Sequence, residues 1–385
     1  MKEISVINNK ALSAELTFLR ERLGDHLCNW YCTVTPKDKK KHEGDKGLVM
    51  SVLPHYAGKI VERLSRYHII PRYYVWWSRM WVTDLLFYKK VANDESKVLY
   101  TYPMCKRSIK AAKKKGKTVV VLLANSESKR EYQRVVEDYN TYHIKHRYIY
   151  GDKKYEYGLS DISSYFDRFI NITEVSRKTF SEAGYDMSKS KLVLDNGTNF
   201  MHKSVDFCNG KKRAFISTAF HSFVKGTHRL LLAWKKADIK DVPLLLVGKM
   251  CEDMTEFIEK NGPFDNVVFV GHCANLKEWY EQWDAVGVIM SLSEGSGRVT
   301  PEMMSFGFPI ISSEDATCDL VVDGYNGSVV DVYDENALVE KLRYYANDWE
   351  KVHELRPNVL ASLGERTIND YASEIADYLV QVASE

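Results

Sequence analysis

The chain has 385 residues, the length of two ordinary domains or of one large domain, and its 45% apolar and 28% charged residues exclude a disordered protein. No apolar run approaches the roughly 18 residues that a membrane span needs, and the start MKEISVINNK lacks the charged-then-apolar pattern of a signal peptide. The seven cysteines are scattered without the paired spacings of zinc or redox sites, so a reduced, cytoplasmic setting is expected.

The net charge of +2 conceals two halves of opposite sign. Residues 1–205 hold 37 lysines and arginines against 23 aspartates and glutamates, a balance of +14. Residues 206–385 hold 17 against 29, a balance of −12. A basic body beside an acidic one predicts that the first half meets a negatively charged partner.

The first half alternates short apolar runs with helical patterns, which predicts a parallel sheet covered on both faces. Strands are expected at 3–8, 97–103, 118–125, 168–173 and 191–197, and helices at 12–23, 105–117, 128–144 and 176–185.

Between these elements lies the aromatic segment YYVWWSRMWVTDLLFY, residues 73–88. Aromatic residues at three- and four-residue spacing usually form core, which favours a buried helix. An amphipathic or stacking surface for an acceptor is the alternative, supported by the basic neighbours Arg72, Arg79, Lys89 and Lys90.

The pattern resets near residue 206, and a second set of alternating elements follows. Strands are expected at 213–219, 243–248, 266–271 and 285–291, and helices at 225–237, 250–262, 276–283, 336–348 and 367–382. The sequence therefore predicts two α/β lobes, each doubly wound, with a cleft between them.

The stretch SLSEGSGRVTPEMMSFGFPIISS, residues 291–313, carries the chemistry. It follows a buried strand, and ligands of open α/β sheets gather beyond such carboxyl ends. Thr300 suits a helix N-cap, Pro301 the first helical position and Glu302 the first turn. The free N–H groups of residues 297–302 are expected to form an anion site that fits a phosphate.

Two carboxylates, Glu294 and Glu302, bracket this expected anion site. Because they would repel a phosphate, they are better suited to accept hydrogen bonds from sugar hydroxyls on either side. A solvated loop carboxylate for Glu294 and a simple helix-start acid for Glu302 are the alternatives, and spacing alone leaves both open.

The stretch resembles the signature of family 4 of the retaining glycosyltransferases, a glutamate followed by seven residues and a second glutamate within EGSGRVTPEMMSFGFPII. Other marks of that family stand in order along the chain: LDNGTN at 194–199, VKG at 224–226, PLLLVGK, NVVFVGH, DAVGVIMS and DLVVDGYNGSVVD. The resemblance covers nearly all of the second half strongly and the first half weakly.

What the resemblance implies is the GT-B fold, two Rossmann-like doubly wound domains facing across a cleft. Residues 1–205 are expected to form the acceptor-binding domain and 206–366 the domain that binds a nucleotide sugar such as a UDP- or GDP-sugar. The last helix, about 367–385, is expected to pack back on the first domain. Such enzymes retain the anomeric configuration and use no metal or other cofactor.

The resemblance also implies roles for individual residues. Glu294 matches the residue that binds hydroxyls of the transferred sugar, Glu302 the one that binds the donor ribose, and Lys225 the cation that neutralises the leaving diphosphate. Phe220 stands where the family carries an arginine, and Arg298 is our candidate to replace it, a surface arginine being the alternative. The remaining residues expected to bind the donor are Gly226, Gly271, His272, Gly295, Ser296, Gly297, Val299 and Thr300.

The acceptor remains open. The basic runs 37–46 and 106–117 favour an anionic one. A lipid-linked or acidic glycan at the cytoplasmic face of a membrane is expected first, with the protein attached peripherally. DNA bearing a hydroxymethylated base, as modified by bacteriophage glycosyltransferases, is the alternative. A nucleotide-sugar-binding protein without turnover is the third hypothesis, since the family arginine is missing.

Overall fold

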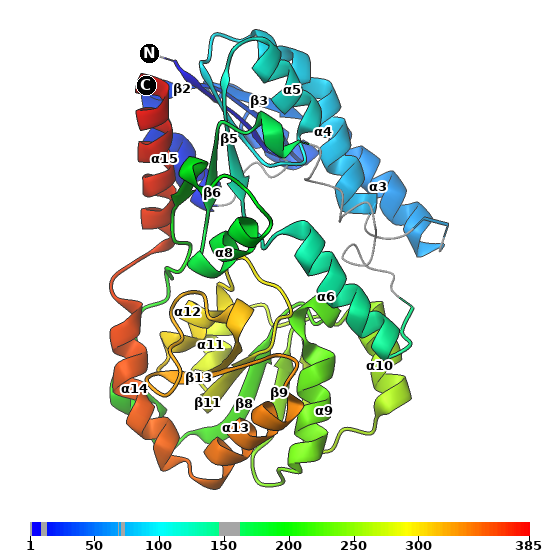
Figure 1. Cartoon of the computed structure of the whole chain (residues 1–385), viewed down its shortest axis with the longest axis vertical. Coiled ribbons are helices and arrows are strands. Elements are labelled where there is room, and N and C mark those ends of the chain that lie inside the picture. The colour runs from blue at the N-terminus through cyan, green and yellow to red at the C-terminus, as the bar shows by residue number, and fades with distance from the viewer. Residues whose placement is uncertain (1, 9–13, 68, 71–73, 146–161) are drawn as a thin grey trace.

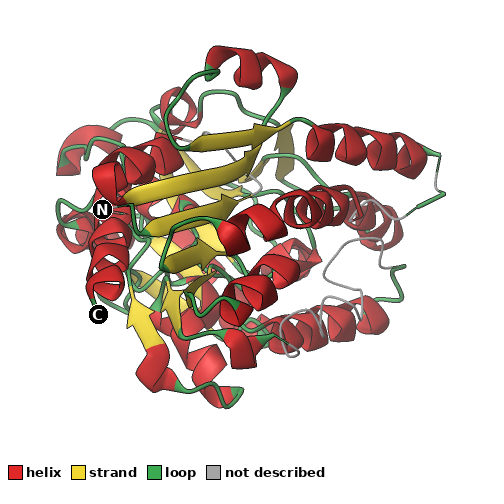
Figure 2. Ribbon diagram, turned by 90° about the horizontal axis from the view of Figure 1, so that it is seen from above, coloured by secondary structure: helices red, strands yellow, loops and turns green. Residues whose placement is uncertain are grey.

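The computed structural model describes residues 2–8, 14–67, 69–70, 74–145 and 162–385. Two all-parallel sheets form two lobes, one above the other in Figure 1. The strand order is β3-β2-β1-β4-β5-β6-β7 in the first sheet and β10-β9-β8-β11-β12-β13 in the second. Figure 2, seen from above, shows the strands flanked by helices. The predicted α/β class with two Rossmann-like lobes is confirmed.

The first sheet is built from short strands whose residues are mostly buried. Its strands are β1 Ile4–Asn8, β2 Leu27–Thr33, β3 Leu48–Ser51, β4 Val98–Thr101, β5 Thr118–Leu123, β6 Arg168–Asn171 and β7 Ser190–Leu192. The described helices of this half of the chain are α1 Ala14–Leu23, α2 Pro36–Lys41, α3 Leu53–Arg66, α4 Tyr74–Asn93, α5 Lys106–Lys114, α6 Ser128–Thr141 and α8 Glu174–Glu182.

The second sheet has its two central strands, β8 and β11, side by side. Its strands are β8 Lys212–Thr218, β9 Leu244–Val247, β10 Val267–Gly271, β11 Trp283–Ile289, β12 Ile310–Ser313 and β13 Gly327–Val330. The later helices are α9 Thr227–Ala237, α10 Glu252–Asn261, α11 Leu276–Tyr280, α12 Val299–Met304, α13 Glu335–Asn347, α14 Glu350–Leu363 and α15 Ile368–Ser384.

Several elements had no counterpart in the prediction, among them β2, β3, β13, α2, α3 and α14. Strand β2 lies between β1 and β3 and is buried along nearly its whole length, so its sequence LCNWYCT shows no alternation of polar and apolar residues. Helix α14 contains Pro357, a residue that normally ends a helix, and is held in place by buried Arg356, which pairs with Asp284.

The aromatic segment forms α4, one side of which is buried, as the first interpretation predicts, while the acceptor surface of the alternative stays a prediction. Met80, Phe87 and Val91 are buried in the core of the first lobe, whereas Trp77 and Trp81 are exposed. Tyr73, the first residue of the segment, and its basic neighbour Arg72 lie outside the described residues.

The last helix, α15, packs against the first lobe. Its residues Ile375 and Leu379 share one buried cluster with Ile4 and Leu19, and Figure 1 shows it beside the N-terminal strand. Its start is held by a capping box of Thr367 and Asp370.

Helix α6 comes from the first half of the chain but packs into the core of the second lobe. Val135 and Tyr139 lie in one cluster with Phe223 and Phe257, and the Tyr139 hydroxyl donates to the Asp253 carboxylate at 2.5 Å. In Figure 1, α6 runs alongside α9 and α10. One helix therefore ties the two lobes together.

Candidate functional site

Lys225 and Glu294 form an ion pair at the carboxyl ends of the two central strands of the second sheet. Lys225 lies in the short helical turn Phe223–Lys225 that follows β8, and Glu294 lies in the loop that follows β11. The Ser291 hydroxyl donates to the same Glu294 oxygen at 3.0 Å. The structure therefore brings together two of the three residues predicted to be catalytic.

Gly226 allows the two loops to approach this closely. Its φ is +62°, and a Cβ at this position would lie 1.8 Å from the Met290 carbonyl oxygen. The Leu292 N–H donates to the Val224 carbonyl at 2.8 Å, which fastens the same two segments. Only glycine meets both demands, a left-handed backbone and no side chain.

The first lobe contacts the other side of the Glu294 loop. The Ser126 hydroxyl donates to the Glu294 carbonyl at 2.8 Å, and the Thr173 hydroxyl donates to the Gly295 carbonyl at 2.9 Å. A Cβ on Gly295 would lie 1.9 Å from the Ala124 carbonyl oxygen, so this residue too must be glycine. Because these partners follow β5 and β6, the loop lies between the carboxyl edges of both sheets.

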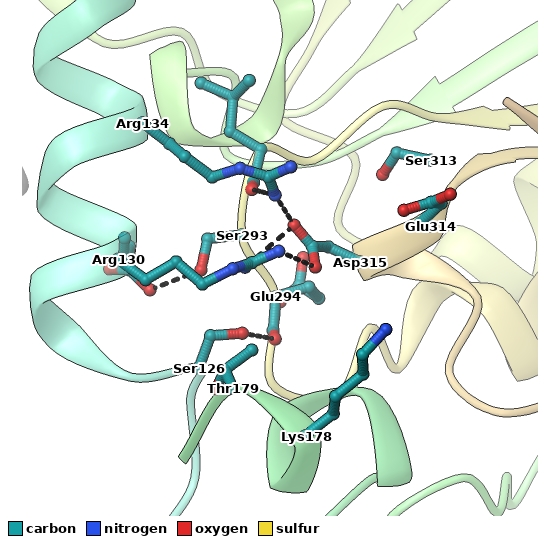
Figure 3. Close-up of polar contacts among 12 residues, drawn as sticks. Ser126, Arg130, Arg134, Lys178, Thr179, Ser293, Glu294, Ser313, Glu314 and Asp315 are labelled. Atoms are coloured by element: carbon teal, nitrogen blue, oxygen red, sulfur yellow. Dashed lines mark hydrogen bonds and ion pairs between the residues drawn. The ribbon is translucent and has the colours of Figure 1, made fainter. Parts of the chain in front are cut away.

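Helix α6 holds this loop through two arginines (Figure 3). Arg130 donates to the Asp315 carboxylate at 3.0 and 3.2 Å, and Arg134 pairs with the same buried carboxylate. Arg134 also donates to the Leu292 carbonyl at 2.6 Å, and the Ser293 hydroxyl donates to the Glu131 carboxylate at 3.0 Å. We call Arg130, Arg134 and Asp315 the α6 clamp.

The α6 clamp was not predicted from the sequence. The spacing of Arg130 and Arg134 places both on one face of a helix, which is the available signal. Asp315, which follows β12, is far away in the sequence, and only the fold shows that the three residues meet.

Arg298, the third predicted catalytic residue, is paired with a carboxylate of the segment that connects the lobes. Its Nε and Nη2 lie 3.3 and 3.2 Å from Asp195 Oδ2, and the neighbouring Ser296 hydroxyl donates to the Asp195 carbonyl. Asp195 therefore offsets the charge of Arg298, and the predicted phosphate-binding role of this arginine stays a prediction.

The start of α12 differs from the prediction. The helix begins at Val299 with Arg298 at the N-cap, and Thr300 lies inside it. The Thr300 hydroxyl is fully buried and donates to the Ala316 carbonyl at 3.4 Å, because burial demands a partner in the core. The prediction that Thr300 is the N-cap is therefore wrong, and so is the prediction that Pro301 is the first helical residue.

Two of the N–H groups predicted to be free at this helix start are already bonded. The Thr300 N–H donates to the Gly297 carbonyl at 2.7 Å, and the Glu302 N–H donates to the Arg298 carbonyl at 3.3 Å. Pro301 has no N–H. The expected anion site therefore loses the N–H groups of Thr300 and Glu302, and an anion site at residues 297–299 stays a prediction.

Glu302 lies in the first turn of α12, as predicted. Burial raises the pKa of its carboxyl to about 7, and the nearby Arg298 acts in the opposite direction. Near neutral pH this carboxyl is therefore poised between its acid and its anion.

Gly271 and His272 lie at the end of β10, the outermost strand of the second sheet, with β9 between it and β8. Gly271 has a φ of +76° and open space around it, and His272 is exposed. Phe220, at the position of the family arginine, is also exposed, whereas His221 is buried and burial lowers its pKa to about 4.

Across the described ranges, no three His, Cys, Asp or Glu side chains are placed to hold a metal ion. None of the helices within those ranges is long and apolar enough to span a membrane.

Residues 202–360 match the family model of glycosyl transferases, group 1. The match covers less than half of the chain but includes Lys225, Glu294 and Glu302. A capsular polysaccharide biosynthesis glycosyltransferase, CapM of Staphylococcus aureus, is 28% identical over 158 residues, 39% of this chain. The aligned region spans 40% of that relative's length.

Solved structures resemble the whole chain. The Anabaena protein HepE, solved with UDP and glucose, superposes with a TM-score of 0.66 at 14% identity and covers 99% of this chain and 100% of its own. Sucrose-phosphate synthase from Thermosynechococcus elongatus has a TM-score of 0.69 at 17% identity, with 100% of both chains covered. The chain has the GT-B fold.

Proposed function

We propose that the chain is a glycosyltransferase that moves a sugar from a nucleotide sugar, such as a UDP- or GDP-sugar, to an anionic acceptor with retention of configuration. The observation that carries the proposal is the Lys225–Glu294 pair between the carboxyl edges of the two sheets. The group 1 family match over 202–360 and the UDP named for HepE are consistent with it.

The charges of the pair suit the two ends of a nucleotide sugar. When the donor is bound, the diphosphate oxygens replace Glu294 as the partner of Lys225, and the hydroxyls of the transferred sugar donate to Glu294 in place of Lys225. Glu302, whose pKa is raised to about 7 by burial, is assigned to the ribose hydroxyls. Arg298 is proposed as a second cation for the diphosphate, for which it has to exchange Asp195 for the donor.

The reaction follows from where charge develops. The bond between the sugar C1 and the donor phosphate oxygen breaks, an acceptor oxygen bonds to C1 on the same face, and the acceptor proton passes to the departing phosphate oxygen. Lys225 stabilises the negative charge that grows on the diphosphate. The two lobes hold donor and acceptor in register, which supplies much of the rate. This sequence of steps needs no metal, and activity in excess EDTA tests that.

For the acceptor we propose a lipid-linked or surface glycan. The relative CapM is named for capsular polysaccharide biosynthesis, and the first half of this chain carries a balance of +14. The same charge favours DNA with a hydroxymethylated base as the second candidate.

Donor turnover tests the function directly. The purified chain should hydrolyse a UDP- or GDP-sugar slowly. It should transfer the sugar faster once a diphosphate-lipid-linked saccharide is added. NMR of the product should show the same anomeric configuration as in the donor. The acceptor panel should include hydroxymethylated DNA. If the chain binds nucleotide sugars but neither hydrolyses them nor transfers the sugar to any acceptor, only the hypothesis of a nucleotide-sugar-binding protein without turnover remains.

A further inference from the structure

Helix α3 carries an apolar stripe that faces solvent. Leu53, Tyr56 and Ile60 are 56%, 47% and 62% exposed, and their spacing of three and four residues places them on one face of the helix. Tyr67, seven residues beyond Ile60, continues the stripe just past the helix end and is exposed as well. Such a stripe normally faces a core, so its exposure needs an explanation.

The fully buried residues of α3 are small, and Val61 and Leu64 are partly buried beside them. Pro54 and Gly58 are the residues buried in this helix. A Cβ on Gly58 would lie 2.2 Å from Arg79 Nε, so glycine at this position allows α4 to cross closely. The helix therefore packs close to α4 at Gly58 and leaves Leu53, Tyr56 and Ile60 outside.

Helix α4, which packs against α3 as a helical hairpin, carries exposed aromatic residues as well. Trp77, Trp81 and Leu85 are 38%, 39% and 40% exposed, and their spacing of four residues places them on one face. The Arg107 guanidinium lies 4.9 Å from the Trp81 ring centroid. We call the exposed stripes of α3 and α4 the hairpin surface.

Basic residues accompany the hairpin surface. Lys59, Arg63 and Arg66 are exposed beside the apolar stripe of α3, and residues 36–66 hold eight lysines and arginines against four aspartates and glutamates. The lysine-rich helix α2 precedes β3, the strand that leads into α3.

We propose that the hairpin surface docks on an anionic lipid bilayer. Leucine and isoleucine gain by entering the acyl boundary, tryptophan and tyrosine favour the interface, and the lysines and arginines meet the anionic headgroups. A nucleic-acid surface offers the basic residues a partner but gives Leu53 and Ile60 none. In Figure 1, α3 lies at the outer margin of the first lobe, where a flat bilayer can reach it.

The position of α3 relates the surface to the Glu294 loop. The helix begins two residues after β3 ends, so it leaves the same carboxyl edge of the first sheet that carries Ser126 and Thr173. A bilayer on the hairpin surface therefore presents a membrane-anchored molecule on the side of the lobe that faces the Glu294 loop. The surface is separate from the donor site, and its test does not depend on turnover.

Flotation of the full chain with vesicles tests the docking surface. We expect binding to phosphatidylcholine–phosphatidylglycerol vesicles and little binding to pure phosphatidylcholine. The double variant Leu53→Glu, Ile60→Glu should lower the partition coefficient at least tenfold, because two charges replace the inserting side chains. The control Val268→Glu changes an equally apolar, 48% exposed residue on the outer strand of the second lobe and should bind like wild type.

A second pair of variants isolates the charges. Lys59→Gln with Arg63→Gln should weaken binding to the anionic vesicles about fivefold for each charge removed. Lys235→Gln with Lys236→Gln, an exposed basic pair on α9, should have no effect. Circular dichroism and melting temperature establish that each variant is folded.

Vesicle binding that is unchanged in the Leu53→Glu, Ile60→Glu variant overturns the proposal. So does a wild-type chain that binds duplex DNA with a steep salt dependence but ignores anionic vesicles. A chain that binds vesicles and lacks donor turnover would contradict the proposed function and leave the docking surface standing.

Discussion

Contacts from both lobes converge on Glu294. Its side chain meets Lys225 and Ser291 of the second lobe, while its backbone carbonyl accepts a hydrogen bond from Ser126 of the first. A carboxylate held in this way keeps its position while its cationic partner is exchanged for a ligand.

We expect Lys225→Ala and Glu294→Gln each to lower the rate of donor hydrolysis by about 10²- to 10³-fold, because each removes a group that acts on developing charge or on the sugar. The controls Lys236→Ala and Glu335→Gln change an exposed ion pair of 2.9 Å in the second lobe. Turnover within twofold of wild type for Glu294→Gln would remove this residue from the mechanism.

We expect the carboxyl of Glu302 to make the free energy of unfolding depend on pH. Because its folded pKa is about 7 and its ordinary value 4.5, the folded chain binds the extra proton between these values. The contribution of the Glu302 carboxyl to the free energy of unfolding therefore falls as pH rises from 4.5 to 7, and it is constant above pH 7. Glu302→Gln should abolish this component and gain up to about 3 kcal/mol over wild type at pH 8.

Melting temperatures of wild type and Glu302→Gln at pH 5 and pH 8 check this expectation. The gap between the two proteins should widen at the higher pH. A gap that is the same at both pH values would mean that this carboxyl titrates at its ordinary pKa.

A side chain at Gly226 would destabilise the fold in two ways, through the left-handed backbone and through a steric clash. Gly226→Ala places a Cβ 1.8 Å from the Met290 carbonyl in a left-handed backbone, whereas Gly324→Ala, at a φ of +73°, meets nothing within 4 Å. Gly324→Ala should cost about 1 kcal/mol in urea unfolding, the price of the backbone conformation alone. Gly226→Ala should cost at least twice as much and also lower donor turnover, because Lys225 moves with the loop. Equal losses of stability would contradict the close approach.

At the scale of elements, α6 joins parts of the chain that are far apart in sequence. Its apolar side enters the core of the second lobe, and the α6 clamp fixes the segment that leads to Glu294. Asp315 is buried, so a clamp that loses an arginine leaves a charge short of partners.

Arg134→Ala should cost about 3 kcal/mol, since it removes both the ion pair with Asp315 and the bond to the Leu292 carbonyl. The control Arg22→Ala breaks an exposed pair with Asp377 and should cost less than about 1 kcal/mol. Urea unfolding measures both. Donor turnover should fall with Arg134→Ala alone, and an unchanged rate would mean that the clamp serves stability only.

The predicted elements were most accurate where one side of a helix or both sides of a strand are buried. The buried runs TVVVLL and KRAFIST were placed correctly as β5 and β8, because apolar runs of this length between turn residues suit a covered parallel sheet. Helix α3 was missed although Leu53, Tyr56 and Ile60 stand at helical spacing, and only the structure shows that this stripe faces solvent while Pro54 and Gly58 are buried.

At the scale of the whole molecule, the two lobes differ in charge and meet around one loop. The basic half supplies α6, Ser126 and Thr173, and the acidic half supplies the strand ends and the Glu294 loop. The chain crosses between the lobes near 194–199 and returns at α15, where the Thr198 N–H donates to the Arg366 carbonyl at 3.2 Å. The two crossings therefore lie against each other.

The sequence by itself determined the two α/β lobes, the loop of Glu294 with the helix start that carries Glu302, and the opposite charges of the halves. These features depend on local periodicity, on turn residues and on counts of side chains. Only the tertiary structure decided that Lys225 meets Glu294, that Arg298 is paired with Asp195, that α6 clamps Asp315 and that the tryptophans of α4 face outward. The physical reason is that these contacts join residues tens to nearly two hundred positions apart, and their partners are selected by sheet order and burial, which no local pattern records.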